Sequence, residues 1–244
     1  MLELCNDKTP LSLDTSRESG VRIAAQIAAY GLSQPFFLVY KGEGGSVLSV
    51  LDGAATLLAG DDADEALCFV AMSPQITSLR TDGETATAFA AARGLAVRTG
   101  NVLKAPQNIL TTGSAKAIAP ADYYPLAKRV FGELMPPFDA WYADVTHRVR
   151  RDKCRLVAVC DEKTPVSGGM TVAETETAWL LGAICTDENY RKRGYAAACV
   201  TALASAGQAQ GKEVFIAAKN EAAQRLYESL GFTVCGTWGQ VDFK

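Results

Sequence analysis

The apolar residues of this chain recur at two spacings, and the spacing changes repeatedly along the sequence. Between Ser16 and Tyr30 they lie three or four positions apart, which predicts a helix with one buried face. Short apolar runs closed by glycine-rich turns, such as Phe36–Tyr40 before Lys41–Gly45, predict strands. The helices predicted in this way span residues 16–30, 62–72, 84–93, 123–134, 138–150, 195–210 and 221–230. The predicted strands span residues 36–40, 47–51, 54–59, 76–79, 95–98, 154–161, 166–173, 179–186, 214–218 and 232–235. This order of elements predicts an α/β protein with a mixed sheet.

Residues 101–120 interrupt the alternation, because small and polar residues surround isolated apolar ones there. Such a composition indicates a connection, and we expect an N-terminal domain at 1–115 and a C-terminal domain at 116–244. The strand–helix–strand layout of residues 74–100 also resembles that of residues 212–236. Sequence identity between the two is thin, so an ancient duplication and two unrelated strand–helix–strand units both remain open.

Composition narrows the classes of protein. The chain has 244 residues, of which 48% are apolar and 21% charged, and its net charge of -3 gives no reason to expect nucleic acid or an anionic membrane as a partner. The start, Met1–Lys8, lacks the character of a signal peptide, and no stretch approaches the ~20 apolar residues that cross a bilayer. We therefore expect a cytoplasmic protein.

Its cysteines and histidine exclude several kinds of chemistry. The seven cysteines are scattered without a CxxC pair, which argues for reduced thiols and against a disulfide framework or a zinc site. His147 is the only histidine, so neither a Ser-His-Asp triad nor a multi-histidine metal site is expected. We expect no metal.

A short basic turn follows the predicted strand that ends at Thr186 and precedes a predicted helix. It consists of Arg191, Lys192, Arg193, Gly194, Tyr195 and Ala196. The first N–H groups of a helix lack partners and the helix dipole favours negative charge there, while Gly194 lets the main chain approach an oxygen closely. With three cations beside it, the turn predicts an anion site; a solvated basic loop before an ordinary helix is the alternative.

A second informative segment runs from Asn220 to Phe232. Asn220 suits an N-cap and Gly231 suits the residue that ends a helix. One face of the helix between them carries Ala223, Leu226, Tyr227 and Leu230. By itself, Tyr227 on that face is better interpreted as a core residue whose hydroxyl finds a partner.

Together, the two segments resemble the two signature motifs of the GNAT family of acyl-CoA N-acyltransferases. Arg191, Gly194 and Ala196 fill the first motif, Arg/Gln-x-x-Gly-x-Gly/Ala. The second motif, Asn-x-x-Ala-x-x-Leu-Tyr-x-x-x-Gly-Phe, is filled by Asn220, Ala223, Leu226, Tyr227, Gly231 and Phe232. The resemblance covers roughly residues 121–244 and implies the GNAT fold for that half.

The resemblance also implies site residues. Acetyl-CoA, as cosubstrate, would bind between the strand ending at Thr186 and the strand 214–218, with its diphosphate on the turn 191–196. The main chain of Ile184, Cys185 and Thr186 would pair with the pantetheine arm, and its N–H groups would polarise the thioester carbonyl. Asn220 matches a position that contacts the pantetheine. Tyr227 matches the general acid that protonates the departing thiolate, for which an ordinary pKa near 10 is suitable.

The motifs specify neither the general base nor a nucleophile for a covalent acyl-enzyme intermediate. Glu174 and Glu176 lie near the end of a predicted strand, where related enzymes often carry a carboxylate, and Glu174 is the candidate base. An exposed hairpin is the alternative for both. Cys185 invites the interpretation of a nucleophile, but no histidine lies near it in sequence to activate it, and a small apolar filler is the alternative.

The N-terminal half lacks both motifs. Where the phosphate turn would fall, Asp61–Glu65 places carboxylates that would repel a diphosphate. This half resembles the degenerate acyltransferase-like half of some two-domain members of the family, and we expect it to shape the acceptor pocket or an interface. One cofactor site per chain follows from this.

The function that the sequence implies is N-acetyl transfer from acetyl-CoA to a primary amine of a small molecule or peptide, by direct attack. We expect a monomer or homodimer, with neither nucleic acid nor a membrane as partner. A catalytically silent CoA-binding sensor of the same fold is the alternative. A nucleotide-binding protein is disfavoured because the pattern Gly-x-x-x-x-Gly-Lys-Ser/Thr is missing.

Overall fold

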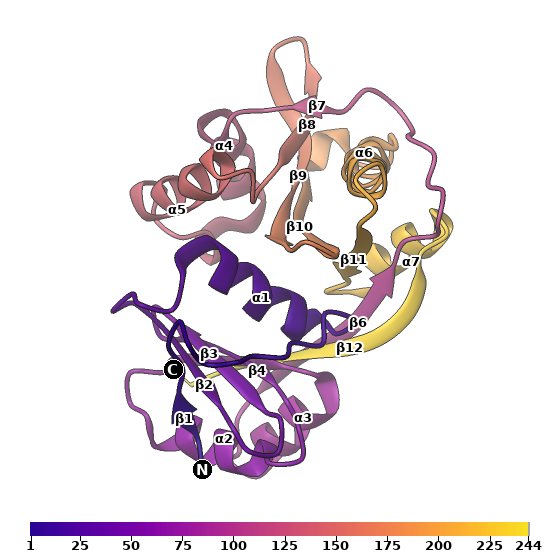
Figure 1. Ribbon diagram of the computed structural model, residues 1–244. Coiled ribbons are helices and arrows are strands. Elements are labelled where there is room, and N and C mark those ends of the chain that lie inside the picture. The colour runs from indigo at the N-terminus through magenta and orange to yellow at the C-terminus, as the bar shows by residue number, and fades with distance from the viewer. Residues whose placement is uncertain (244) are drawn as a thin grey trace. The chain divides into compact units, whose positions relative to one another are not determined.

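The computed structural model describes residues 1–243 as two compact units (Figure 1). Unit 1 contains residues 1–102, 218–220 and 234–243, and unit 2 contains residues 103–217 and 221–233. The chain therefore passes between the units more than once. The predicted domain boundary at 115/116 stays a prediction. The two units differ from the predicted domains mainly because the last strand of the chain pairs with a strand of unit 1.

Unit 1 is a mixed sheet with helices on both faces (Figure 1). Its strands are β1 (Glu3–Leu4), β2 (Phe37–Lys41), β3 (Val47–Leu51), β4 (Ala54–Leu58), β5 (Ser78–Thr81), β6 (Val97–Lys104) and β12 (Thr233–Asp242). They lie in the order β1-β2-β3-β4-β5-β12-β6. Helix α1 (Glu18–Tyr30) covers one face, and α2 (Ala63–Met72) and α3 (Gly83–Ala91) cover the other.

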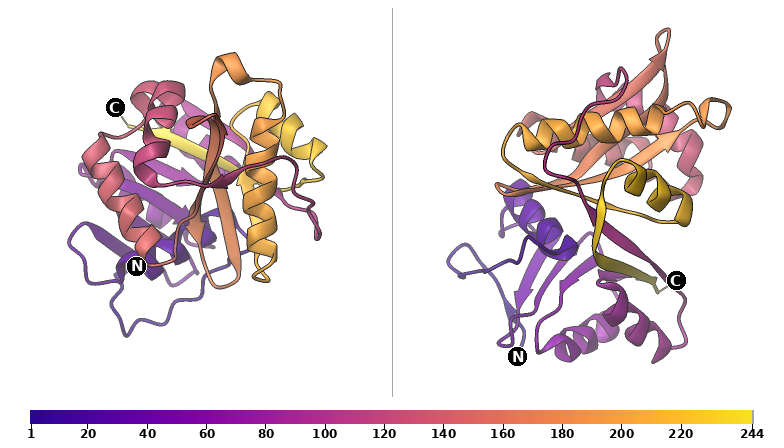
Figure 2. Two further views of the ribbon diagram at one scale, coloured as in Figure 1. Left: turned by 90° about the horizontal axis from the view of Figure 1, so that it is seen from above. Right: turned by 90° about the vertical axis from the view of Figure 1, so that its right-hand side faces the viewer.

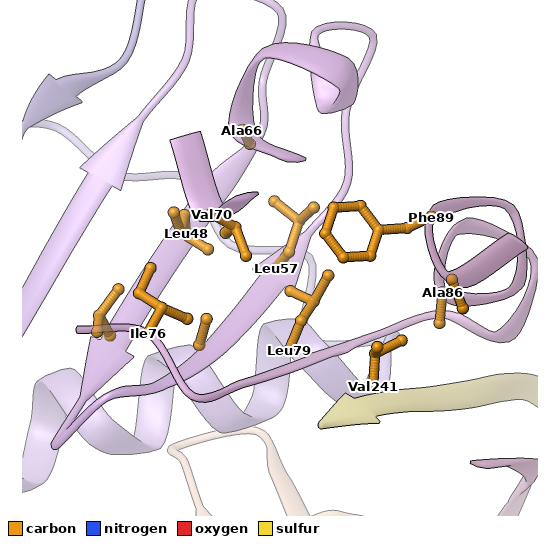
Figure 3. Packing of buried hydrophobic residues seen from close by; sticks show 12 residues of the cluster. Leu48, Leu57, Ala66, Val70, Ile76, Leu79, Ala86, Phe89 and Val241 are labelled. Carbon is orange, nitrogen blue, oxygen red and sulfur yellow. The ribbon is translucent and has the colours of Figure 1, made fainter. Parts of the chain in front are cut away.

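The core of unit 1 shows why these segments pair as they do. Leu57 and Leu79, on neighbouring parallel strands, meet Val70 of α2 and Phe89 of α3 (Figure 3). Val241 of β12 joins the same cluster and is fully buried. Alternate residues of these strands thus face α2 and α3 on one side of the sheet and α1 on the other, and this burial of apolar side chains is the main source of stability in such a layered unit.

Unit 2 repeats this plan (Figures 1 and 2). Its further strands are β7 (Lys116–Ala117), β8 (Leu156–Asp161), β9 (Thr164–Glu174), β10 (Ala178–Thr186) and β11 (Glu213–Ala217). Their order is β6-β11-β10-β9-β8-β7, β6 contributing its last two residues. Helices α4 (Pro120–Phe131) and α5 (Phe138–Arg150) lie on one face and α6 (Tyr195–Gln208) on the other, while α7 (Glu221–Ser229) follows β11. Short 3-10 turns occupy Gly132–Leu134 and Glu188–Tyr190.

The parallel strands β10 and β11 separate part of the way along. They pair from Ala178↔Glu213 to Leu181↔Ile216, where the pairing between described residues ends. On the other side of β10 the register with β9 shifts between Gly182 and Cys185, and Ala183 has a left-handed φ of 49°. This is the geometry of a β-bulge, which bends a strand and turns its main-chain groups away from the sheet.

Most element positions agree with the sequence prediction, and two strands are much longer than predicted. Strand β6 extends to Lys104, into the predicted connection, and β12 extends to Asp242 rather than ending at Cys235. Both contain polar or glycine residues that weaken the periodic signal, and both are held by neighbouring strands. The strand–helix–strand layout does recur in the two units, and duplication stays a hypothesis.

Candidate functional site

The basic turn forms a cradle at the N-terminus of α6. Lys192 and Gly194 both have left-handed φ values, 60° and 78°, which fold the main chain back before the helix begins at Tyr195. A Cβ added to Gly194 would meet no atom within 4 Å, so the side on which a ligand would lie is open. The first turn of α6 contains no acidic residue. Its unpaired N–H groups and the helix dipole therefore favour an anion.

The arginines of the turn are exposed but oriented. The Nε of Arg191 donates to the carbonyl of Thr186 at 3.5 Å. The guanidinium of Arg193 lies 5.2 Å from the ring centroid of Tyr190, whose hydroxyl donates to Asp161 at 2.7 Å. These contacts limit the conformations of both cations before any ligand arrives, which lowers the entropic cost of binding.

A cavity of about 370 Å³ adjoins this helix start. Its lining includes Gly194, Tyr195 and Ala198, together with Thr112–Ser114 of the connecting segment. The N–H of Thr112 donates to Thr201 Oγ1 at 3.0 Å, which fixes that segment along α6. Sequence analysis missed Thr112–Ser114, because no motif marks a loop whose relevance comes from lying beside a distant helix.

Beyond the bulge, β10 continues to pair with β9. Cys185 and Thr186 pair with Gly168 and Ser167 of β9. Toward β11, the described pairing of β10 ends at Leu181↔Ile216. Where two parallel strands separate in this way, an extended ligand can be added beside one of them as a further strand, which suits the role predicted for the main chain of Ile184–Thr186.

The side chain of Cys185 lies in the core under α4. The residue is 3% exposed, and its Sγ is 3.6 Å from the hydroxyl of Tyr123. This cluster also contains Leu126, Trp141 and Met170. The environment is that of a small apolar filler, since a nucleophilic thiol needs access and a group that stabilises its thiolate.

Asp187, directly after β10, connects the end of that strand to α4. Its carboxylate accepts from Arg129 Nη1 at 2.5 Å and from the N–H of Asn189 at 3.1 Å. The hydrogen bond from Arg129 lowers the pKa of Asp187, so the pair stays ionised at neutral pH. The ion pair therefore fixes the point at which the chain leaves the sheet for the basic turn. Neither residue was identified from the sequence.

Tyr227 lies in α7 and is only 5% exposed. Its ring centroid is 6.2 Å from that of Phe232, and Gly231, with φ of 86°, ends the helix as predicted. Burial raises the pKa of Tyr227 to about 12, so the ordinary value near 10 expected for it is wrong. A buried phenol is a weaker acid because its anion loses solvation. Asn220 belongs to unit 1, and its role stays a prediction.

Glu174 has the contacts of a structural residue. It is 3% exposed, and its carboxylate accepts hydrogen bonds from Arg155 and Thr171. Arg155 in turn stacks 4.4 Å from the ring centroid of Trp179. Glu174 pairs with Trp179 at the start of β10, and roughly 15 Å of strand separate that point from Ile184. These contacts and this separation argue against Glu174 as the base, which stays an untested prediction.

In unit 1, the acidic turn before α2 and the end of β4, which correspond to the basic turn and the end of β10, already form hydrogen bonds within the unit. Asp62, preceding α2, accepts from the N–H groups of Gly44 and Ser46, both at 2.9 Å. Arg17 donates to the carbonyl of Ala59, just after β4, at 2.8 Å and forms an ion pair with Asp82 at 3.4 Å. The acidic turn thus serves to hold a hairpin loop, and the main chain at the end of β4 already has a side-chain partner.

The sequence of residues 120–232 matches the model of the acetyltransferase (GNAT) family. No curated protein matches the chain. A GCN5-related N-acetyltransferase from Kribbella flavida is 16% identical, with a TM-score of 0.63 over 92% of this chain and 95% of that one. A GNAT-family acetyltransferase from Colwellia psychrerythraea is 13% identical, with a TM-score of 0.60 over the whole of both chains.

A tandem GNAT protein from the clavulanic acid biosynthesis pathway is 15% identical, with a TM-score of 0.53 over 99% of this chain and 98% of that one. The family model thus identifies residues 120–232 as an acetyltransferase (GNAT) domain. The whole chain has a two-lobed α/β architecture like that of the tandem protein.

Residues 1–243 hold no group of three or more histidine, cysteine, aspartate or glutamate side chains placed to bind a metal ion. No helix among them is both long and apolar enough to cross a bilayer.

Proposed function

We propose that unit 2 transfers an acetyl group from acetyl-CoA to a primary amine, with Tyr227 as the proton donor. The observation that carries this proposal is the cradle at Lys192–Gly194, which combines a helix N-terminus, exposed arginines and an open cavity within a domain of this family. The residues fit a diphosphate, because they provide unpaired N–H donors and positive charge without a neighbouring carboxylate in the first turn.

Acetyl-CoA, when bound, supplies a thioester whose carbonyl carbon is electrophilic. Main-chain N–H groups of Ile184–Thr186 polarise its carbonyl oxygen. The neutral amine forms the new C–N bond as the C–S bond breaks, and its excess proton passes to water. Tyr227 gives its hydroxyl proton to the departing sulfur and then regains a proton from water, so that no net proton is released. Because burial raises the pKa of Tyr227 to about 12, the donor form is lost only as the pH rises through that value.

The acceptor that we propose is a primary amine of a small molecule or a peptide, and neither nucleic acid nor a membrane surface is part of the proposal. We place the protein in the cytoplasm. None of the seven cysteines, all of which lie within residues 1–243, forms a disulfide, as a reducing compartment would favour.

The test combines calorimetry with acetyl-CoA and thiol release in the presence of a panel of small amines and peptides. We expect binding, turnover with at least one amine, and a 10- to 100-fold lower kcat for Tyr227→Phe with CoA affinity within a few-fold. Between pH 6 and about pH 10 the rate should show no descending limb from Tyr227.

Tyr40→Phe is the matched control, because Tyr40 is also partly buried, its ring is 4.8 Å from that of Phe69, and burial raises its pKa. Its kcat should stay within twofold of the wild-type value. Binding without turnover on any amine would favour the silent CoA sensor. An unchanged rate for Tyr227→Phe would remove Tyr227 from its role.

A further inference from the structure

A tyrosine of helix α4, which packs on one face of the sheet, forms a hydrogen bond with the bulge of β10. Tyr123, in α4, is completely buried, and its hydroxyl donates a hydrogen bond to the carbonyl oxygen of Ala183. Ala183 is the residue with the left-handed φ of 49°, and it lies within the register shift between β9 and β10. A residue with a Cβ adopts this conformation only when its surroundings enforce it.

Several contacts fix the position of the Tyr123 ring. It stacks on Trp141 at 6.1 Å between centroids, with an interplanar angle of 19°. Gly168 of β9 leaves space for the ring, because a Cβ at that position would lie 2.7 Å from Tyr123 Cε2. The Sγ of Cys185 is 3.6 Å from the same hydroxyl. The donor is therefore held at one place by α4, α5 and both strands.

The hydrogen bond to Ala183 also sets the direction of a neighbouring N–H. In a planar trans peptide the carbonyl of one residue and the N–H of the next point in opposite directions. The Ala183 carbonyl points to the hydroxyl on the α4 face, so the Ile184 N–H points away from that face. Ile184 is the first residue of the main-chain segment that would polarise the thioester carbonyl.

We propose that Tyr123 is a positioning residue for acetyl transfer, and that its hydroxyl keeps the bulge at Ala183 in the conformation that aims the Ile184 N–H. This inference rests on the proposed function of unit 2. Tyr123 touches neither substrate, and it acts through the peptide group between Ala183 and Ile184. Burial raises the pKa of Tyr123 well above 10, so its hydroxyl remains a donor throughout the working range of pH.

The test compares Tyr123→Phe with Tyr124→Phe. Tyr124 is the next residue of α4, and its hydroxyl also donates to a main-chain carbonyl, that of Pro136 at 2.7 Å, at an exposed site. Each variant thus loses one hydroxyl–carbonyl hydrogen bond from the same helix. We expect kcat to fall about tenfold or more for Tyr123→Phe with the KM for acetyl-CoA within twofold, and both constants to stay within twofold for Tyr124→Phe.

Infrared spectroscopy of bound acetyl-CoA carrying ¹³C at the thioester carbonyl gives a readout that needs no turnover. Polarisation by the Ile184 N–H lowers the carbonyl stretching frequency in wild type, and Tyr123→Phe should lose part of that shift. Absence of acetyl-CoA binding in wild type would defeat the proposed function itself. Binding and turnover with the same kcat and the same carbonyl frequency in Tyr123→Phe would overturn only the role of Tyr123.

Ala183→Gly, added to Tyr123→Phe, separates positioning from general stabilisation. Glycine adopts a positive φ without the steric cost that alanine pays, so the bulge depends less on the hydroxyl. We expect the double variant to recover part of the lost kcat and of the carbonyl shift, and it is the variant to use should Tyr123→Phe fail to fold. A double variant no better than Tyr123→Phe in both readouts would contradict the proposal.

Discussion

Glu174 shows how the surroundings of a residue decide its chemistry. On the sequence it is a carboxylate near a strand end, which is compatible with a general base. In the structure it accepts hydrogen bonds from Arg155 and Thr171 and is almost completely buried. Burial raises its pKa despite those hydrogen bonds, because desolvation disfavours the charged form. The Glu174 carboxylate therefore has a structural role, because it joins the end of β9 to Arg155, the residue just before β8.

This interpretation predicts the behaviour of Glu174→Gln. Removing one partner of a buried ion pair leaves the other charge uncompensated, so we expect the free energy of unfolding to fall by about 2–4 kcal/mol. The kcat for acetyl transfer should remain within threefold of wild type at a temperature where both are folded. Chemical denaturation and steady-state kinetics measure the two quantities. A hundredfold loss of kcat with unchanged stability would restore Glu174 as the base.

Tyr227 is the residue for which the sequence was most informative. Its helix, the glycine that ends it and its buried face were all predicted from spacing. Its acidity was not, because a pKa depends on how much water the fold removes from the hydroxyl. Tyr123 carried no signal at all: a tyrosine in an amphipathic helix looks like any core aromatic until the bulge of β10 is placed beneath it.

At the scale of elements, a glycine with a left-handed φ lies near each end of α6. Substituting each of them allows the cost of backbone strain to be measured separately from the effect on ligand binding. Gly194 before the helix and Gly211 after it have φ values of 78° and 71°. A Cβ on either would meet no atom within 4 Å. The two differ in location, since Gly194 lies in the basic turn and Gly211 lies at the opposite end of the helix.

We therefore predict that Gly194→Ala and Gly211→Ala each lower the free energy of unfolding by about 1 kcal/mol, the cost of a left-handed alanine. Gly194→Ala alone should weaken acetyl-CoA binding, by tenfold or more, because its Cβ stands where the diphosphate approaches the N–H groups. Denaturant titration and calorimetry test this pair. Equal CoA affinities in the two variants would show that the turn is an ordinary basic loop.

The elements themselves were largely predictable where a periodic apolar pattern marks them. Helices α1, α2, α5 and α6 begin within two residues of the predicted starts. Strands β6 and β12 were predicted far too short, because the residues beyond the apolar part of each are stabilised by cross-strand hydrogen bonds rather than by an apolar pattern of their own. Such bonds join segments distant in sequence, which local spacing cannot report.

At the scale of the whole molecule, the C-terminal strand belongs to unit 1. Strand β12 pairs antiparallel with β5 from Gly239↔Thr81 to Asp242↔Ser78 and lies between β5 and β6 in the order of strands. Trp238 Nε1 donates to the carbonyl of Ala218 at 3.0 Å, and Arg80 lies 4.4 Å from the centroid of the Trp238 ring. An interior strand of unit 1 is thus supplied by residues more than 130 positions after the other interior strands of that unit.

Truncation after Thr233 should therefore unfold unit 1 although it leaves residues 1–102 intact in sequence. It removes a central strand and the buried Val241, and no local segment can replace either. Deletion of residues 1–4 is the control, because β1 is a two-residue edge strand with both residues exposed. Hydrogen exchange resolved by peptide should show lost protection in β3 to β5 for the C-terminal truncation only. Retained protection there would contradict this assignment of β12.

The sequence by itself determined the order of helices and strands and the basic turn at Arg191–Ala196. It also determined that the helix of Tyr227 follows this turn along the chain. These are local features, fixed by residue spacing and by the chemistry of glycine, arginine and tyrosine. Only the tertiary structure decided that β10 and β11 part after Leu181, that Thr112–Ser114 lines the cavity at α6, and that the bulge at Ala183 is held by Tyr123. Those features depend on contacts between residues far apart in the chain, and such contacts exist only after the apolar faces have been buried against one another.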